Sequence, residues 1–163
     1  MLNHYWIILI IFLLKRFLEI NINPDIIIKL LELLEKLLKK LESTSKIPKD
    51  IFLNDFTEIL AVQRALVLSI NICIDIGAHI LAANNINKPE TYKKIFVDLS
   101  KNNVISKHLS ESLTEFVGLR NLLGNIYSEI NNNRIYEIIQ NELDLFRNFQ
   151  KQLLKKFRNQ LKN

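Results

Sequence analysis

The sequence has little of what β-turns and disulfide frameworks require. Its 163 residues include 3 glycines, 3 prolines and 1 cysteine. Because turns between strands depend on glycine and proline, this scarcity favours an all-α chain over a β-sandwich or barrel. A single cysteine excludes an intramolecular disulfide, and Cys73 lies in an apolar run where a buried, unreactive thiol is expected. We therefore expect a protein of the reducing cytoplasm.

The sequence also lacks the common signatures of phosphate-binding, nucleophilic and metal-dependent sites. It has no glycine-rich phosphate loop, no Walker motif and no nucleophile elbow. Two of its 3 histidines, His4 and His108, have no ligand-type residues at metal-binding spacing. We therefore predict neither a metal site nor a cofactor.

Helix-forming and apolar residues make up the chain instead. The hydrophobic fraction is 48%, and the length is sufficient for one domain with a hydrophobic core. The net charge is +5 and the pI is about 9.3. A basic chain of this kind is mildly favourable to a polyanionic partner, although a solvated basic surface accounts for the charge equally well.

Apolar residues recur at helical spacing in five segments, separated by asparagine-rich or proline-containing breaks. The predicted helices run over 24–43, from between 50 and 54 to 83, over 89–101, from Ser106 or Ser110 to about 130, and over 134–157. The second is apolar on two sides, which predicts a helix at the centre of a bundle or at a subunit interface. The predicted fold is all-α, an up-and-down bundle of four to five helices with an N-terminal helical extension.

Residues 1–22 are predicted to be an apolar extension of a domain that spans 23–163. The apolar run from Tyr5 to Leu14 has about half of the roughly 20 residues that a membrane-spanning helix needs. It also matches a secretory signal poorly, because no positive segment precedes it and no small-residue cleavage site follows. A helix packed on the domain or on a partner is preferred. An extension from an upstream start codon and membrane contact are the alternatives.

The strongest functional pattern is one short stretch, Arg120-Asn121-Leu122-Leu123-Gly124-Asn125-Ile126-Tyr127. On a helix that turns by about 100° per residue, its apolar side chains share one arc, which we expect to pack in the core: Leu119, Leu122, Leu123 and Ile126. Four polar side chains share the opposite arc around Gly124: Arg120, Asn121, Asn125 and Tyr127. Because an ordinary surface helix would carry Lys and Glu there, this arc is a candidate binding face.

This stretch resembles the active-site signature of HEPN-type toxins of the HepT family. In that signature an Arg is followed, after a short spacer, by a His and then, two positions later, by a Tyr. Arg120 and Tyr127 match, but Asn125 stands where the family has His. Weaker landmarks extend the resemblance, in the right order, over about Pro24 to Phe149: Gln63-Arg64-Ala65, 73–80, 89–92, Val104-Ile105-Ser106 and Arg134-Ile135-Tyr136.

The resemblance implies a homodimer in which this arc faces its copy and forms one cleft for RNA. It also implies metal-independent cleavage of the RNA backbone, which needs a proton donor and acceptor near neutral pH and a cation for the phosphate. Arg120 keeps the cationic role, with Asn121 orienting the phosphate. Asn125 cannot replace the His, because an amide does not titrate, and loss of a general acid–base group typically lowers the rate by about 10²–10⁴.

The resemblance implies a second role for Tyr127. In HepT-like toxins, a minimal nucleotidyltransferase antitoxin of the MntA type transfers AMP to this Tyr, and the added phosphates block the RNA site. Tyr127 is therefore an AMPylation candidate. The alternative is a Tyr that serves only at a dimer interface.

His79 is a minor alternative as the catalytic base. It lies one helical turn from Asp75, so the two side chains could form a hydrogen bond. A core histidine satisfied by this bond is the preferred interpretation. Basic residues near the C-terminus could also touch RNA, although a solvated helix end is preferred for them: Lys151, Lys155, Lys156 and Arg158.

Three functional hypotheses follow. The first is a HepT-like toxin of a toxin–antitoxin pair whose ribonuclease scaffold is inactivated by Asn125, either as a deliberate substitution or by natural drift. Whether this copy is an enzyme therefore stays open. The second is a catalytically silent HEPN module that binds RNA or an MntA-like nucleotidyltransferase. The third is a helical scaffold that assembles through the segment from Tyr5 to Leu14.

Overall fold

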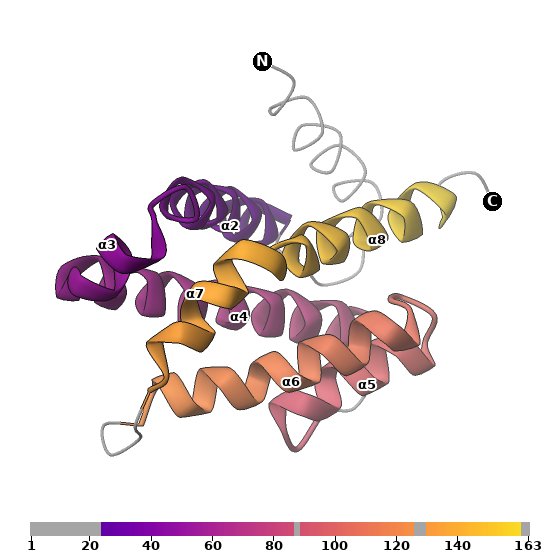
Figure 1. The fold of residues 1–163 in the computed structure, drawn as a ribbon. Coiled ribbons are helices and arrows are strands. Elements are labelled where there is room, and N and C mark those ends of the chain that lie inside the picture. Colours follow the sequence, from indigo (N-terminus) through magenta and orange to yellow (C-terminus); the bar gives the residue numbers. More distant parts are fainter. Residues whose placement is uncertain (1–23, 87–88, 126–129, 161–163) are drawn as a thin grey trace.

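The computed structural model describes residues 24–86, 89–125 and 130–160, and these residues are all helical or in loops. Seven helices follow one another: α2 (Pro24–Thr44), α3 (Lys49–Asn54), α4 (Phe56–Ala83), α5 (Tyr92–Lys101), α6 (Lys107–Leu123), α7 (Asn132–Asn141) and α8 (Asp144–Gln160). Figure 1 shows α2 on one side of α4, with α5 and α6 on the other. The predicted all-α bundle is confirmed. The predicted extension, residues 1–22, lies outside the described residues.

Helix α4 is the centre of this bundle. It contacts the six other described helices, from α2 to α8. By length and composition it is apolar enough to cross a membrane, but 61% of its most apolar stretch is buried inside the protein. A helix in the core of a protein can be equally long and apolar, and the central position of α4 accounts for its apolar composition.

Side-chain caps begin α5 and α6. The Ser106 hydroxyl accepts a hydrogen bond from the Leu109 amide at 3.3 Å, so α6 begins where the sequence predicts. The Thr91 hydroxyl does the same for α5, which therefore begins at Tyr92 and not at Pro89 as predicted. Pro89 and Glu90 therefore precede the helix and are not part of it.

Asparagines end α4 and α5. Asn85 and Asn103, just beyond these helices, have φ angles of 56° and 54°. Asparagine tolerates this left-handed conformation better than most residues, and it is a common way to end a helix. The asparagine-rich segments therefore break the helices as predicted.

Two of the predicted helices are each split in two. Asp55 has an extended backbone, with φ −101° and ψ 93°, and separates α3 from α4. A turn at Glu142 separates α7 from α8. The apolar stripe of the last predicted helix stays buried across this turn: Ile135, Ile138, Ile139, Leu143, Phe146, Phe149 and Leu153. Periodicity identified the buried face but not the break, because the stripe continues through it.

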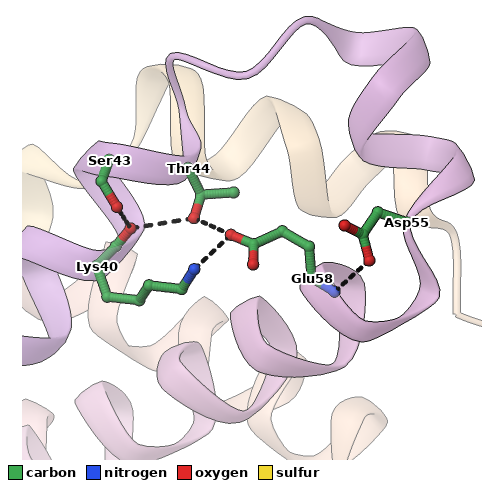
Figure 2. Close-up of polar contacts among 5 residues, drawn as sticks. All are labelled: Lys40, Ser43, Thr44, Asp55 and Glu58. Carbon is green, nitrogen blue, oxygen red and sulfur yellow. Dashed lines mark hydrogen bonds and ion pairs between the residues drawn. The ribbon is translucent and has the colours of Figure 1, made fainter.

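A polar cluster joins the end of α2 to the start of α4 (Figure 2). The Glu58 carboxylate accepts hydrogen bonds from Lys40 Nζ and from the Thr44 hydroxyl, both at 2.5 Å. The Asp55 carboxylate accepts the Glu58 amide at 2.9 Å and caps α4. The hydrogen bonds from Lys40 and Thr44 lower the pKa of Glu58 below its usual value, so this carboxylate stabilises the fold in its charged form.

Candidate active site

The candidate motif begins in the last turn of α6 and continues beyond it. Helix α6 ends at Leu123, where the Gly124 amide donates a hydrogen bond to the Arg120 carbonyl at 3.0 Å. The prediction that this helix runs to about Ile130 is wrong, since Ile130 is not helical. Glycine disfavours helix interiors and is common where helices end, which accounts for the stop.

The predicted polar arc is therefore only partly a helix face. Arg120 and Asn121 extend from α6, whereas Asn125 lies in the segment after it, exposed to solvent. The Asn125 amide donates to the Leu122 carbonyl at 3.2 Å, which keeps it next to the helix end. Tyr127 lies outside the described residues. Among the described residues, the predicted helical arc therefore holds for Arg120 and Asn121 and not for Asn125.

The apolar arc is confirmed at two positions. Leu119 and Leu123 are partly buried and pack against the core. Leu122 is 42% exposed, so the prediction that it packs in the core is wrong. Ile126 lies outside the described residues.

Three neighbours hold the Arg120 side chain. Its Nε donates to Asn71 Oδ1 of α4 at 3.0 Å, and its Nη1 donates to Asn121 Oδ1 at 3.2 Å. Its guanidinium carbon lies 5.4 Å from the ring centroid of Tyr92, within the range of a cation–π contact. The half-buried guanidinium therefore lies where α4, α5 and α6 meet.

The partners of Arg120 within the described residues are neutral. Arg147, in contrast, forms ion pairs with Glu35 and Glu42, and Arg134 also pairs with a glutamate. Because two amide oxygens and an aromatic ring orient Arg120 without cancelling its charge, the guanidinium can still attract an anion.

A groove of about 720 Å³ opens beside Arg120, between α4, α5 and α6. Tyr92 and Asn121 belong to both the groove and the Arg120 cluster, and Asp75 and Glu90 also line it. Burial raises the pKa of Asp75. This volume lies within the usual range for small-molecule sites. The geometry therefore provides a cation beside a space that a nucleotide-sized group could enter.

His79 gains no support as a replacement base. No hydrogen bond joins it to Asp75, so that expected contact is absent. The charge of His79 does act on Asp75, because it opposes the burial effect on the pKa of that carboxyl. The two residues line a neighbouring hollow of about 300 Å³.

Other candidate groups lie outside this cluster. Across the described parts of the chain, no three His, Cys, Asp or Glu side chains gather in a way that could hold a metal ion. Cys73 is fully buried, as predicted, and burial raises the pKa of its thiol. Lys151, Lys155 and Lys156 lie on α8 and take no part in the contacts around Arg120, and the side chain of Arg158 is outside the described set.

Sequence reasoning missed Asn71 and Tyr92 as members of the site. The available indication for Asn71 was its position, because it is an amide between the apolar residues Ile70 and Ile72 in the middle of a helix. Tyr92 belonged to a family landmark, but nothing in its spacing pointed to Arg120. Both contacts join residues that are far apart in the sequence, and helical periodicity does not predict such contacts.

Comparisons with known proteins identify the family of the chain. The family model described as ribonuclease HepT-like matches residues 30–153. The mRNA nuclease HepT of Shewanella oneidensis is 31% identical over 129 residues, which cover 77% of this chain and 93% of the relative. The tRNA nuclease HepT of Aphanizomenon flos-aquae is 33% identical over 119 residues, which cover 73% and 81% of the two chains.

Solved structures give the same result. A tri-AMPylated HEPN toxin of Shewanella oneidensis, solved in complex with an MNT antitoxin, has a TM-score of 0.75 and 30% identity, covering 81% of this chain and 98% of the toxin. The cytosolic protein YutE of Bacillus subtilis, of unknown function, has a TM-score of 0.73 at 20% identity and so shares the fold. From the matched family model and these relatives, the chain belongs to the HepT-like ribonuclease family.

Proposed function

We propose that this chain is the toxin of a HepT-like toxin–antitoxin pair, built on an RNA endonuclease scaffold. Arg120 carries the proposal, because it is a half-buried guanidinium with neutral partners beside a groove. An arginine in this state can hold a phosphodiester through parallel N–H bonds and stays charged at any relevant pH. The relatives named as mRNA and tRNA nucleases support RNA as the ligand.

Arg120 and Asn125 meet the needs of backbone cleavage unequally. Cleavage without a metal requires a proton to be taken from the attacking hydroxyl, a proton to be given to the leaving oxygen, and a cation near the phosphate. Arg120 supplies the cation. The Asn125 amide does not exchange protons, so we expect this copy to bind RNA and to cleave it about 10²–10⁴ times more slowly than a form with His at that position.

Asn121 has a revised role in this proposal. The sequence led us to expect that it orients the phosphate directly. Its Oδ1 instead accepts from Arg120 Nη1, so we assign it to holding the arginine.

The proposed partners are a second copy of the chain and an MntA-like nucleotidyltransferase antitoxin. The tri-AMPylated relative in complex with an MNT antitoxin supports the second partner. Tyr127 is the proposed AMP acceptor, on the basis of its spacing from Arg120. We further propose that the domain spans 23–163, that residues 1–22 are an extension of it, and that the pair acts in the cytoplasm without a membrane.

A catalytically silent module is the second candidate, and Asn125 itself favours it. Such a module would keep the Arg120 site and bind RNA or the nucleotidyltransferase without cleaving. Gly124 fits this candidate too, because it ends α6 directly before the position of the missing His.

RNA cleavage by the wild-type protein and by Asn125→His separates these candidates. We expect cleavage by the variant, loss of that cleavage when Arg120→Ala is added, and little cleavage by the wild type. Asn125→Gln is the matched control, since it changes the side chain but keeps an amide. Expression of each form in growing cells gives the parallel test of toxicity.

RNA binding, measured by fluorescence anisotropy, completes the test. Binding that depends on Arg120 but without cleavage by any folded variant would favour the silent module. A folded protein that neither binds nor cleaves RNA would contradict both candidates.

A further inference from the structure

We propose that Asn71 and Tyr92 are positioning residues for Arg120. Together with Asn121 they form a clamp that fixes the guanidinium in one orientation and leaves its Nη1–Nη2 edge for a phosphate group. The role of the clamp in RNA binding rests on the proposed function, whereas its contacts are observed in the structure.

Asn71 is an unfavourable residue for the interior of α4, and its hydrogen bond with Arg120 offsets this loss of stability. Its neighbours Ile70 and Ile72 are buried, and the helix around it is apolar. Asparagine is a poor residue for a helix interior, and a half-buried amide is unfavourable unless it forms hydrogen bonds. Within the described residues, the side chain of Asn71 bonds only to Arg120 Nε, at 3.0 Å. The position is therefore explained by that contact and not by packing.

The Tyr92 ring supports the guanidinium from one side. It is the first residue of α5, and Thr91 fixes the backbone directly before it by capping the helix. Tyr92 is 47% exposed, so it adds little to the core, yet Arg120 lies over its ring. A cation is attracted to an aromatic face, and this contact restricts how the planar guanidinium can move.

These contacts determine which donors remain for a ligand. The Nε–H is directed to Asn71, and one Nη1–H is directed to Asn121. The two Nη2–H donors have no partner among the described residues; one lies on the Nε side of the guanidinium, and the other lies on the far edge, which Nη1 shares. That edge matches two oxygens of a phosphate group. Because Asn71 occupies the Nε–H of the side edge, the clamp favours end-on binding at the Nη1–Nη2 edge, with the flexible side chain ordered before RNA arrives.

Kinetics in the Asn125→His background test the clamp. We expect Asn71→Ala and Tyr92→Leu each to lower kcat by about 10–100-fold with a smaller change in KM, because a misplaced group weakens transition-state contacts most. Tyr92→Phe keeps the ring and should stay within about 3-fold of the parent. Val97→Ala, at an exposed position on the same helix, is the matched control.

A double-mutant cycle and NMR distinguish positioning from a general loss of structure. Adding Asn71→Ala to Arg120→Ala should cause no further loss of activity, since the clamp acts only through the arginine. In the wild-type protein, the Nε–H resonance of Arg120 should be resolved, and it should shift and broaden in folded Asn71→Ala. This second measurement requires no RNA and no activity.

The possible outcomes separate the two proposals. If Arg120→Ala abolishes cleavage while Asn71→Ala and Tyr92→Leu behave like Val97→Ala, the clamp is wrong and the proposed function stands. If Arg120→Ala changes neither cleavage nor RNA binding, the proposed function fails. An Arg120 Nε–H resonance that is unaffected by Asn71→Ala would overturn the clamp in either case.

Discussion

Two half-buried arginines of this protein, Arg120 and Arg147, are held in opposite ways. Arg147, on α8, donates to Glu42 and Glu35 on α2 and so ties the last helix to the first described one. Arg120, at the end of α6, is oriented as firmly, but by amides and an aromatic ring. The comparison shows that a side chain can be fixed without its charge being neutralised. The charge of Arg147 serves the fold, whereas that of Arg120 stays available to a ligand.

The environment of Arg147 explains why its carboxylate partners are needed. Burial alone would lower the pKa of Arg147, but hydrogen bonds and charges from Glu42 and Glu35 reverse the effect and raise it. Glu35 is only 5% exposed, and its Oε1 has no hydrogen-bond partner within the described structure. The single contact between Glu35 and Arg147 Nη1 is therefore the one that compensates a buried negative charge.

The largest expected effect is that of Arg120→Ala on activity. In the Asn125→His background we expect kcat/KM for RNA to fall by about 10²–10³, the usual cost of removing a donor that stabilises transition-state charge. The free energy of unfolding in urea should fall by about 1 kcal/mol, because the half-buried Asn71 amide loses its partner but water can still reach it. A variant that keeps its activity but loses several kcal/mol of stability would place Arg120 in the same class as Arg147.

Arg147→Ala should show the opposite pattern. Removing one partner of a buried ion pair costs about 3–5 kcal/mol, and we expect roughly 2–3 kcal/mol here because Arg147 is 30% exposed on its side chain. Urea denaturation measures this loss. Arg134→Ala is the control, since its pair with Glu142 is at the surface and should contribute about 0–1 kcal/mol. Cleavage by folded Arg147→Ala, Asn125→His protein should be unchanged, and a large loss would contradict the comparison.

Much of this fold follows from local patterns. Apolar spacing identified the buried faces of the long helices, and the asparagine-rich breaks and the Ser106 cap fixed several ends. The splits at Asp55 and Glu142 did not follow. At both positions the apolar pattern continues, so periodicity alone does not show the break. At Asp55 the local signal is the side chain itself, which caps α4 by accepting the Glu58 amide.

The site was predicted only in part for a similar reason. Arg120 and Asn121 were identified from the motif. The predicted arc also included Asn125, because we expected the helix to continue past that residue, whereas α6 ends at Leu123. The contacts with Asn71 and Tyr92 link three helices, and their existence depends on how α4, α5 and α6 are packed. A motif can therefore identify the charged residue of a site before it shows which neighbours orient that residue.

The smallest expected effect concerns Asp75, a carboxylate in the groove beside Arg120. Burial raises its pKa, so the folded state holds this proton more tightly than the unfolded chain, and stability falls as pH rises through the shifted pKa. Asp75→Asn removes this penalty and should raise stability above that pH by roughly a few tenths of a kcal/mol, because the side chain is largely exposed. Urea unfolding at acidic and neutral pH would show the gain at neutral pH only.

RNA binding by the same variant tests the comparison between the two arginines. If the charge of Arg120 is unopposed, Asp75 repels RNA only at a distance, through solvent, and Asp75→Asn should tighten binding by no more than about 3-fold. An increase of more than about 10-fold would mean that the Asp75 carboxylate had been neutralising Arg120. In that case both arginines would be neutralised by carboxylates, and they would differ only in how completely. The affinity of the groove for RNA would then depend on whether the Asp75 carboxyl group is protonated.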